Sequence, residues 1–132
     1  MNTQQRMISF IQFQLPAIAW CMFIYIASSI PMTKLPSLEN YSDKFVHAGV
    51  FFILAWLMHV ALFHQGSRQL SRYSLVITVL FVMMFGVLDE FHQSFTPGRS
   101  VDPFDVVADT FGAVMYAALN LRFKFYRMGT GE

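Results

Sequence analysis

Apolar residues dominate four stretches of this chain, and the first of them contains no charge from Met7 to Thr33. That length exceeds the ~20 residues that a membrane-spanning helix needs. We place this first helix near residues 8–30. Pro16 lies inside it and is expected to kink it, which a membrane helix tolerates when neighbouring groups satisfy the freed carbonyl. A cleaved signal peptide is the alternative, but its apolar core is typically only about 7–15 residues long.

Turn signals separate the three further apolar stretches. Ser42 is a candidate N-cap, and Asp43 follows in the first turn, where the helix dipole favours an anion. A proline–glycine pair at 97–98 marks another turn. Asp102 followed by Pro103 has the pattern of an N-cap with proline at the first helical position. These signals place the remaining helices near residues 43–63, 73–91 and 103–121.

The composition favours lipid rather than water as the surroundings. Hydrophobic residues make up 55% of the chain and charged residues only 13%, whereas soluble domains carry roughly 25% charged residues. We therefore expect one all-α domain over residues 1–132, a polytopic membrane protein built as a bundle of four transmembrane helices. The net charge of +1 and the lack of a basic patch argue against a nucleic-acid partner. The single cysteine, Cys21, excludes an internal disulfide and a cysteine-based metal site.

The distribution of cations predicts the orientation. Four spans put the N-terminus, the 64–72 loop and the C-terminus on one side of the membrane. Six of the nine cations lie on that side, namely Arg6, Arg68, Arg72, Arg122, Lys124 and Arg127. The other side holds Lys34, Lys44 and Arg99. The positive-inside rule then places both termini in the cytoplasm of a multi-pass cell-membrane protein, in the inner membrane if the source is Gram-negative.

Acidic and histidine residues gather at the predicted outward ends of the last three helices. The first helix brings no such motif, and we expect it to serve as a membrane anchor and as one wall of the bundle. The group comprises Asp43, Lys44, His47, Asp89, Glu90, His92, Gln93, Arg99, Asp102, Asp105 and Asp109, with Glu39 in the outer loop. A spacing of four residues puts Asp43 and His47 on one helix face, and likewise Asp105 and Asp109. Helix capping or a structural ion-pair network would explain many of these residues. Ionisable residues at a membrane boundary are nevertheless candidates for function.

Three sequence blocks at these positions resemble the VanZ-like family of small membrane proteins. The blocks are Asp43-Lys44-Phe45-Val46-His47 with Phe51, the run from Asp89-Glu90 through Gln93 to Pro97-Gly98-Arg99, and Asp105 to Gly112. They follow in order over residues 43–112. Asp109 stands where such proteins often carry asparagine. The resemblance implies a four-helix membrane protein of the cell envelope, a link to glycopeptide (teicoplanin) resistance, and a relation to enzymes that act on lipid head groups.

On the first interpretation, the protein is an enzyme that transfers or hydrolyses a phosphate-linked head group at the outer leaflet. A polyprenyl-phosphate or a phospholipid would be the substrate. His47, oriented by Asp43, would be the general base or nucleophile, because its pKa suits proton transfer near neutrality. Asp89 or Glu90 would be the general acid.

The same interpretation supplies a substrate-binding set. Arg99 would clamp the phosphate in a bidentate grip, with Lys44 as a second cation. Gln93, Asp105 and Asp109 would complete the set. Asp105 and Asp109 could also hold a divalent cation together with Asp89, and carboxylate oxygen atoms suit Mg²⁺ or Ca²⁺.

A second interpretation needs no catalysis. The same side chains would form a buried ion-pair network that packs four short helices, because charges in lipid need partners whatever their purpose. The protein would then be a scaffold, or would bind a lipid, a glycopeptide or another protein. Transport is a third possibility, for which a dimer could supply the path. The oligomeric state is left open by the sequence.

Overall fold

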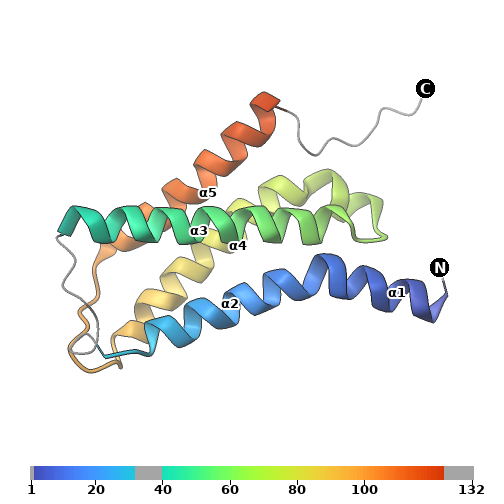
Figure 1. The fold of residues 1–132 in the computed structure, drawn as a ribbon. Coiled ribbons are helices and arrows are strands. Elements are labelled where there is room, and N and C mark those ends of the chain that lie inside the picture. Colours follow the sequence, from blue (N-terminus) through green and yellow to red (C-terminus); the bar gives the residue numbers. More distant parts are fainter. Residues whose placement is uncertain (1, 32–39, 124–132) are drawn as a thin grey trace.

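The computed structural model describes residues 2–31 and 40–123, and every regular element in these ranges is helical (Figure 1). The elements are α1 (Thr3–Ser9), η1 (Phe10–Gln14), α2 (Leu15–Ser28), α3 (Asn40–Phe63), α4 (Arg68–Gln93) and α5 (Pro103–Phe123). The first three join into one continuous segment, Thr3–Ser28, so that four segments are long and apolar enough to cross a membrane. The predicted all-α fold with four spans is therefore confirmed.

Pro16 is accommodated by a local change of helical winding. Proline has no N–H and its ring collides with the preceding turn, so an α-helix must adjust just before it. The adjustment here is the π-helical turn η1, in which the N–H of Leu15 reaches back five residues to the carbonyl of Phe10. A wider turn of this kind relieves the collision without ending the helix.

The starts of α3 and α4 differ from the predicted ones. α3 begins at Asn40, so Ser42 lies in its first turn and the prediction that Ser42 is the N-cap is wrong. α4 begins at Arg68 rather than 73, because Ser67 caps it by accepting a hydrogen bond from the N–H of Leu70 at 3.4 Å. Polar residues at the start of α4 continue the helix, since long cationic side chains can extend out of the bilayer from a helical backbone.

The start of α5 agrees with the sequence. Pro103 is its first residue, and the Asp102 carboxylate accepts a hydrogen bond from the N–H of Phe104 at 2.9 Å, as an N-cap does. The preceding turn is also as expected, because the N–H of Arg99 donates to the carbonyl of Thr96 at 3.1 Å and Gly98 has a φ of 75°. Most of the outer loop between the first two predicted helices lies outside the described residues, as do Lys34, Glu39, Lys124, Arg127 and Glu132.

The helices pack around a small apolar core. α3 lies against both α4 and α5, and α2 contacts α3 and α4 (Figure 1). The core comprises Ile24, Phe51, Leu54, Ala55, Val82, Ala113 and Tyr116. Many large apolar side chains instead point outward, among them Phe45 and Phe104, which are 79% and 71% exposed. Such surfaces suit lipid as the solvent, because a soluble monomer rarely leaves so much apolar area in water.

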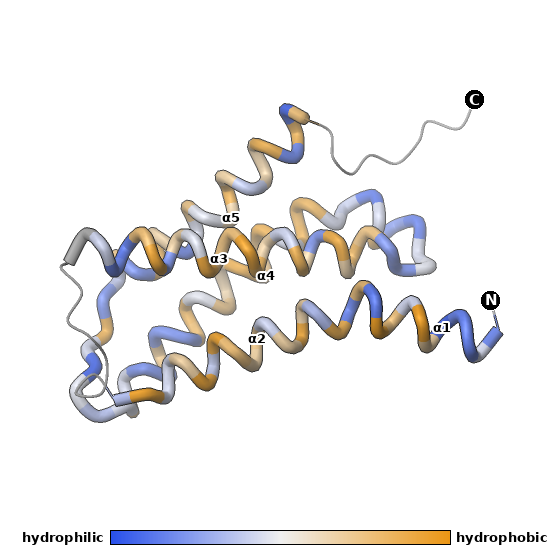
Figure 2. The backbone as a smooth tube through the Cα atoms, in the orientation of Figure 1, coloured by the Kyte–Doolittle hydropathy of each residue, from blue (hydrophilic) through white to orange (hydrophobic). Residues whose placement is uncertain are grey.

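α2 and α4 end, and α3 and α5 begin, at the same end of the bundle, which we call the polar end. Figure 2 shows hydrophilic residues gathered there and apolar residues along the helix shafts. All six described carboxylates lie at this end: Asp43, Asp89, Glu90, Asp102, Asp105 and Asp109. The opposite ends of the helices carry Arg6, Arg68, Arg72 and Arg122.

Candidate functional site

The polar side chains at this end form two clusters rather than one. The His47 cluster consists of Asp43, Lys44, His47, Glu90, Asp102, Asp105 and Asp109, from α3, α4, α5 and the turn before α5. The Asp89 cluster consists of Ser28, Asp89, Gln93, Thr96 and Arg99, from α2, α4 and the turn after it. The Asp89 cluster joins α2 to the end of α4, whereas the His47 cluster joins α3, α4 and α5.

His47 is held by a carboxylate of another helix. Its Nδ1 lies 3.0 Å from Oδ1 of Asp109, which is completely buried on α5. A carboxylate at that position requires a proton on Nδ1, so in the neutral ring Nε2 carries the lone pair. Nε2 lies 3.9 Å from Oδ2 of Asp105. The sequence pairs His47 with Asp43 through their spacing on one helix, but the hydrogen-bonded partner is Asp109.

Asp109 itself fits against α4 at a glycine. A Cβ added to Gly86 would lie 2.9 Å from Oδ2 of Asp109. The small residue therefore lets the buried carboxylate approach the α4 backbone closely. This Oδ2 has no hydrogen-bond partner among the described residues.

Lys44 is occupied by two carboxylates. Its ammonium donates to Oδ2 of Asp102 and to Oδ1 of Asp105. The hydrogen bond from Lys44, helped by the N–H of Phe104, holds the pKa of the Asp102 carboxyl below its ordinary value. A lowered pKa means that the Lys44–Asp102 pair contributes stability above the ordinary carboxyl pKa and loses it only as the pH falls through the lowered one. The pair is therefore intact at neutral pH.

Glu90 reaches the His47 cluster from α4. Its Oε2 accepts a hydrogen bond from the N–H of Asp102 at 2.8 Å. Its Oε1 has no hydrogen-bond partner among the described residues, and it has no access to solvent either, because the residue is only 3% exposed. A buried carboxylate oxygen without a partner is costly and calls for an explanation beyond packing.

Three side chains of the His47 cluster could hold a metal ion. Asp43, His47 and Asp105 each offer one ligand atom, and the three atoms lie within 4.8 Å of one another. The set mixes one nitrogen with carboxylate oxygens, whereas the sequence suggested oxygen ligands alone. Of the three carboxylates that the sequence suggested for a cation, only Asp105 is in this set. Asp109 bonds to His47, and Asp89 belongs to the other cluster.

The Asp89 cluster fastens α2 to the end of α4. Ser28, the last residue of α2, donates to Oδ1 of Asp89 at 2.6 Å, and Gln93 donates to Oδ2 at 2.9 Å. Both oxygens of this buried carboxylate are thus used. The first helix carries none of the acidic or histidine residues, but it brings Ser28 to this end, a small polar residue at the end of an apolar run that the sequence analysis does not single out.

Arg99 completes this cluster by capping the C-terminus of α2. Its guanidinium donates to the carbonyls of Ala27 and Ile30, each at 3.3 Å, and to Oε1 of Gln93 at 3.4 Å. Thr96 adds a hydrogen bond to the carbonyl of Ser28 at 3.1 Å. The last carbonyls of a helix lack partners within it, and a cation is favourable there. Arg99, expected to clamp phosphate, is therefore engaged with the protein itself.

The other histidines have local partners. His92 lies 2.9 Å from the Ser29 hydroxyl and stacks on Tyr25. His59 is buried and lies 2.8 Å from the Tyr116 hydroxyl. Neither belongs to the two clusters at the polar end.

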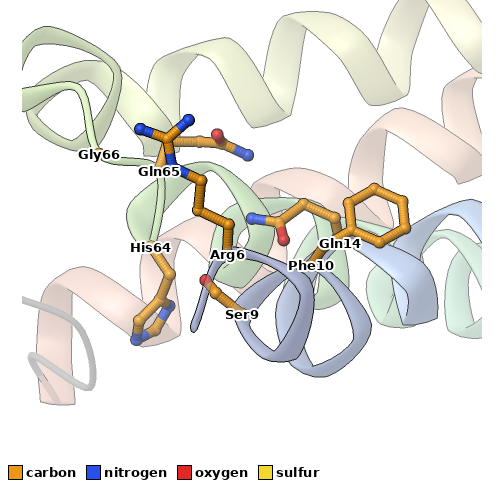
Figure 3. Close-up of a pocket in the computed structure, with 7 residues that line it drawn as sticks. All are labelled: Arg6, Ser9, Phe10, Gln14, His64, Gln65 and Gly66. Atoms are coloured by element: carbon orange, nitrogen blue, oxygen red, sulfur yellow. The ribbon is translucent and has the colours of Figure 1, made fainter. Parts of the chain in front are cut away.

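A cavity of about 680 Å³ lies at the opposite end of the bundle (Figure 3). Its lining residues are Arg6, Ser9, Phe10, Gln14, His64, Gln65 and Gly66. None of the residues singled out from the sequence as a site lines it, and it contains no carboxylate. The cavity is large enough for a ligand, but the carboxylates that the structure describes lie at the other end.

Comparison with known proteins identifies a family and a relative. A family model described as VanZ/LLP1 matches residues 7–124. An uncharacterized protein of Schizosaccharomyces pombe is 34% identical over 88 residues, which is 66% of this chain and 51% of that protein. This chain therefore spans about half the length of that relative. No solved structure matches this chain.

Proposed function

Since this chain belongs to the VanZ/LLP1 family of membrane proteins, we propose that its His47 cluster binds a phosphate-linked lipid head group and catalyses the transfer or hydrolysis of that group. The substrate class is a polyprenyl-phosphate or a phospholipid, which reaches the polar end within the bilayer. The polar end faces outward in this proposal, because the described cations at the other helix ends favour the cytoplasm.

The observation that carries the proposal is the unpartnered Oε1 of Glu90 beside the His47–Asp109 pair. A network that only stabilised the fold would gain by pairing every buried carboxylate oxygen, as the Asp89 cluster does. Glu90 keeps one buried oxygen without a partner among the described residues, and its charge interacts with that of His47, whose tautomer is fixed by Asp109. Such an arrangement suits proton transfer to and from a bound substrate.

The proposal assigns different roles to the two neighbouring acids. Glu90 is the general acid and base, because one of its oxygens is available. Asp89 is a structural residue, because Ser28 and Gln93 use both of its oxygens. His47 contributes its unprotonated Nε2 to the site, because Asp109 keeps the proton on Nδ1.

We expect Glu90→Gln to lower the rate of head-group release by about 10²–10⁴-fold, as loss of an acid–base group does. His47→Ala should also lower this rate, because the site loses its unprotonated nitrogen. The measurement uses purified protein in lipid nanodiscs with radiolabelled polyprenyl-phosphate or phospholipid. His92→Ala is the matched control, because His92 lies at the same end but bonds to Ser29, and it should retain the wild-type rate. Equal release by wild type and His47→Ala would refute this assignment.

A non-catalytic scaffold is the second candidate, and the closed pairing of Arg99 with α2 favours it. Such a protein would hold a lipid or a glycopeptide and alter the cell envelope, including its response to glycopeptide antibiotics, without turnover. Saturable head-group binding with no release by folded wild-type protein would favour this candidate.

A further inference from the structure

With all of its carboxylates ionised, the His47 cluster holds more negative charge than its own cations balance. Five carboxylates belong to it, and among the described residues they share one lysine, Lys44, together with His47. Arg99 is committed to the carbonyls that end α2. An entering phosphate would add negative charge at a site of reduced dielectric, where like charges repel strongly. Phosphate recognition at this cluster therefore needs another cation.

The gap between His47 and Asp105 suits a shared ion better than a direct bond. Nε2 and Oδ2 are 3.9 Å apart, which is beyond hydrogen-bonding distance. Two donor atoms that bind one metal at about 2.1 Å each lie at most about 4.2 Å from one another. Asp43 is the third candidate donor. The ligand atoms of all three side chains lie within 4.8 Å of one another, so a shift of a few tenths of an ångström, on the order of 0.6 Å at most, would bring them all within reach of one ion.

The surroundings of His47 are those of a metal ligand. A histidine that binds a metal through one nitrogen almost always donates its other N–H to a carboxylate or carbonyl, which fixes the ring. Asp109 occupies that position at 3.0 Å from Nδ1. This carboxylate lies close to the α4 backbone at Gly86.

Glu90 is an independent indication of a ligand at this place. Its side chain is 97% buried, one oxygen is fixed by the N–H of Asp102, and the other has no partner among the described residues. It lies close enough to His47, Asp105 and Asp109 for their charges to act on it. A water molecule bound to a cation in the cluster would provide the missing partner for Oε1.

We propose that Asp43, Asp105 and Nε2 of His47 bind a divalent cation, with Asp109 positioning the imidazole. The mixed nitrogen and oxygen ligands favour Mn²⁺ or Zn²⁺ over Mg²⁺ and Ca²⁺, which prefer oxygen alone. Three protein ligands leave coordination positions for a phosphate oxygen and water. Coordination of a phosphate oxygen rests on the proposed function, whereas cation binding itself does not.

The test is a Mn²⁺ titration of the full chain in phosphatidylcholine nanodiscs, followed by electron paramagnetic resonance. Wild type should bind one ion tightly, and electron spin-echo modulation should reveal one coordinated ¹⁴N. His47→Gln should remove the nitrogen signal and weaken binding at least tenfold, and Asp105→Asn should weaken binding at least tenfold. Asp109→Asn should keep the nitrogen signal and weaken binding by about 10–100-fold, as loss of a supporting carboxylate does.

His92→Gln is the matched control and should keep both the affinity and the nitrogen signal. Wild type without a ¹⁴N signal, or equal affinity in wild type and His47→Gln, would overturn the cation site without requiring any variant to be active. Tight binding without head-group release supports the cation site and counts against the proposed function. Release that persists in chelator, with no Mn²⁺ site, overturns the cation site and leaves the proposed function standing.

Discussion

Replacing Gly112 by alanine is expected to disrupt the packing of α3 against α5. A Cβ at Gly112 would lie 2.2 Å from the carbonyl oxygen of Ala48 and 3.0 Å from the backbone nitrogen of Phe52. These are backbone atoms of a helix, so they cannot turn aside as a flexible side chain does. We expect a loss of about 3 kcal/mol in the free energy of unfolding, the upper part of the range for overpacked sites. The measurement is thermal unfolding in detergent, with the yield of monodisperse protein.

Two other glycines provide graded controls for this prediction. A Cβ at Gly49 on α3 would meet no atom within 4 Å, so Gly49→Ala should leave stability unchanged or raise it by about 0.5–1 kcal/mol. Gly86→Ala should lie between the two, because the atom 2.9 Å from its Cβ belongs to the Asp109 side chain, which can shift. If Gly112→Ala proves as stable as Gly49→Ala, the close approach of α3 and α5 is wrong.

The spans could be predicted from the sequence because their cause is local. A run of apolar residues must leave water whatever surrounds it, and the run from Met7 to Ser28 becomes helix as expected. The start of α4 was predicted too late, because charge alone does not end a helix. Arg68 and Arg72 continue the helix once Ser67 caps it.

The pairing of the polar residues could be predicted only in part. Spacing along one helix identifies neighbours on the same face, such as Asp43 and His47, which do share the His47 cluster. It says nothing about which helix supplies the hydrogen-bond partner, and Asp109 comes from α5. The sequence groups Arg99 with the acids around it, whereas its guanidinium donates hydrogen bonds to the carbonyls at the end of α2. The α2 carbonyls need a hydrogen-bond donor, but Arg99 can be recognised as that donor only once α2 is known to lie beside the turn after α4.

The strongest prediction for the Asp89 cluster concerns the exchange of hydrogen-bond donor and acceptor between positions 89 and 93. Asp89→Asn should lower the free energy of unfolding by about 1–3 kcal/mol, the cost of leaving a buried polar group unpaired. If the oxygen of the new amide at position 89 faces Ser28, its nitrogen meets the Gln93 amide nitrogen, and both are donors. If the new amide turns round, the Ser28 hydroxyl proton loses its acceptor. Gln93→Glu should also destabilise, because it sets a second carboxylate against Asp89.

Combining Asp89→Asn with Gln93→Glu should restore most of the lost stability. The amide at position 89 can then donate to the carboxylate at 93 and still accept from Ser28, while the other oxygen at 93 accepts from Arg99. Thermal unfolding of wild type, both single variants and the double variant gives the coupling energy, expected at about 1–3 kcal/mol in the restoring direction. A double variant no more stable than the weaker single variant would show that no such chain of hydrogen bonds fastens α2. Restoration would establish that these residues serve the fold, and would leave the His47 cluster as the place to look for chemistry.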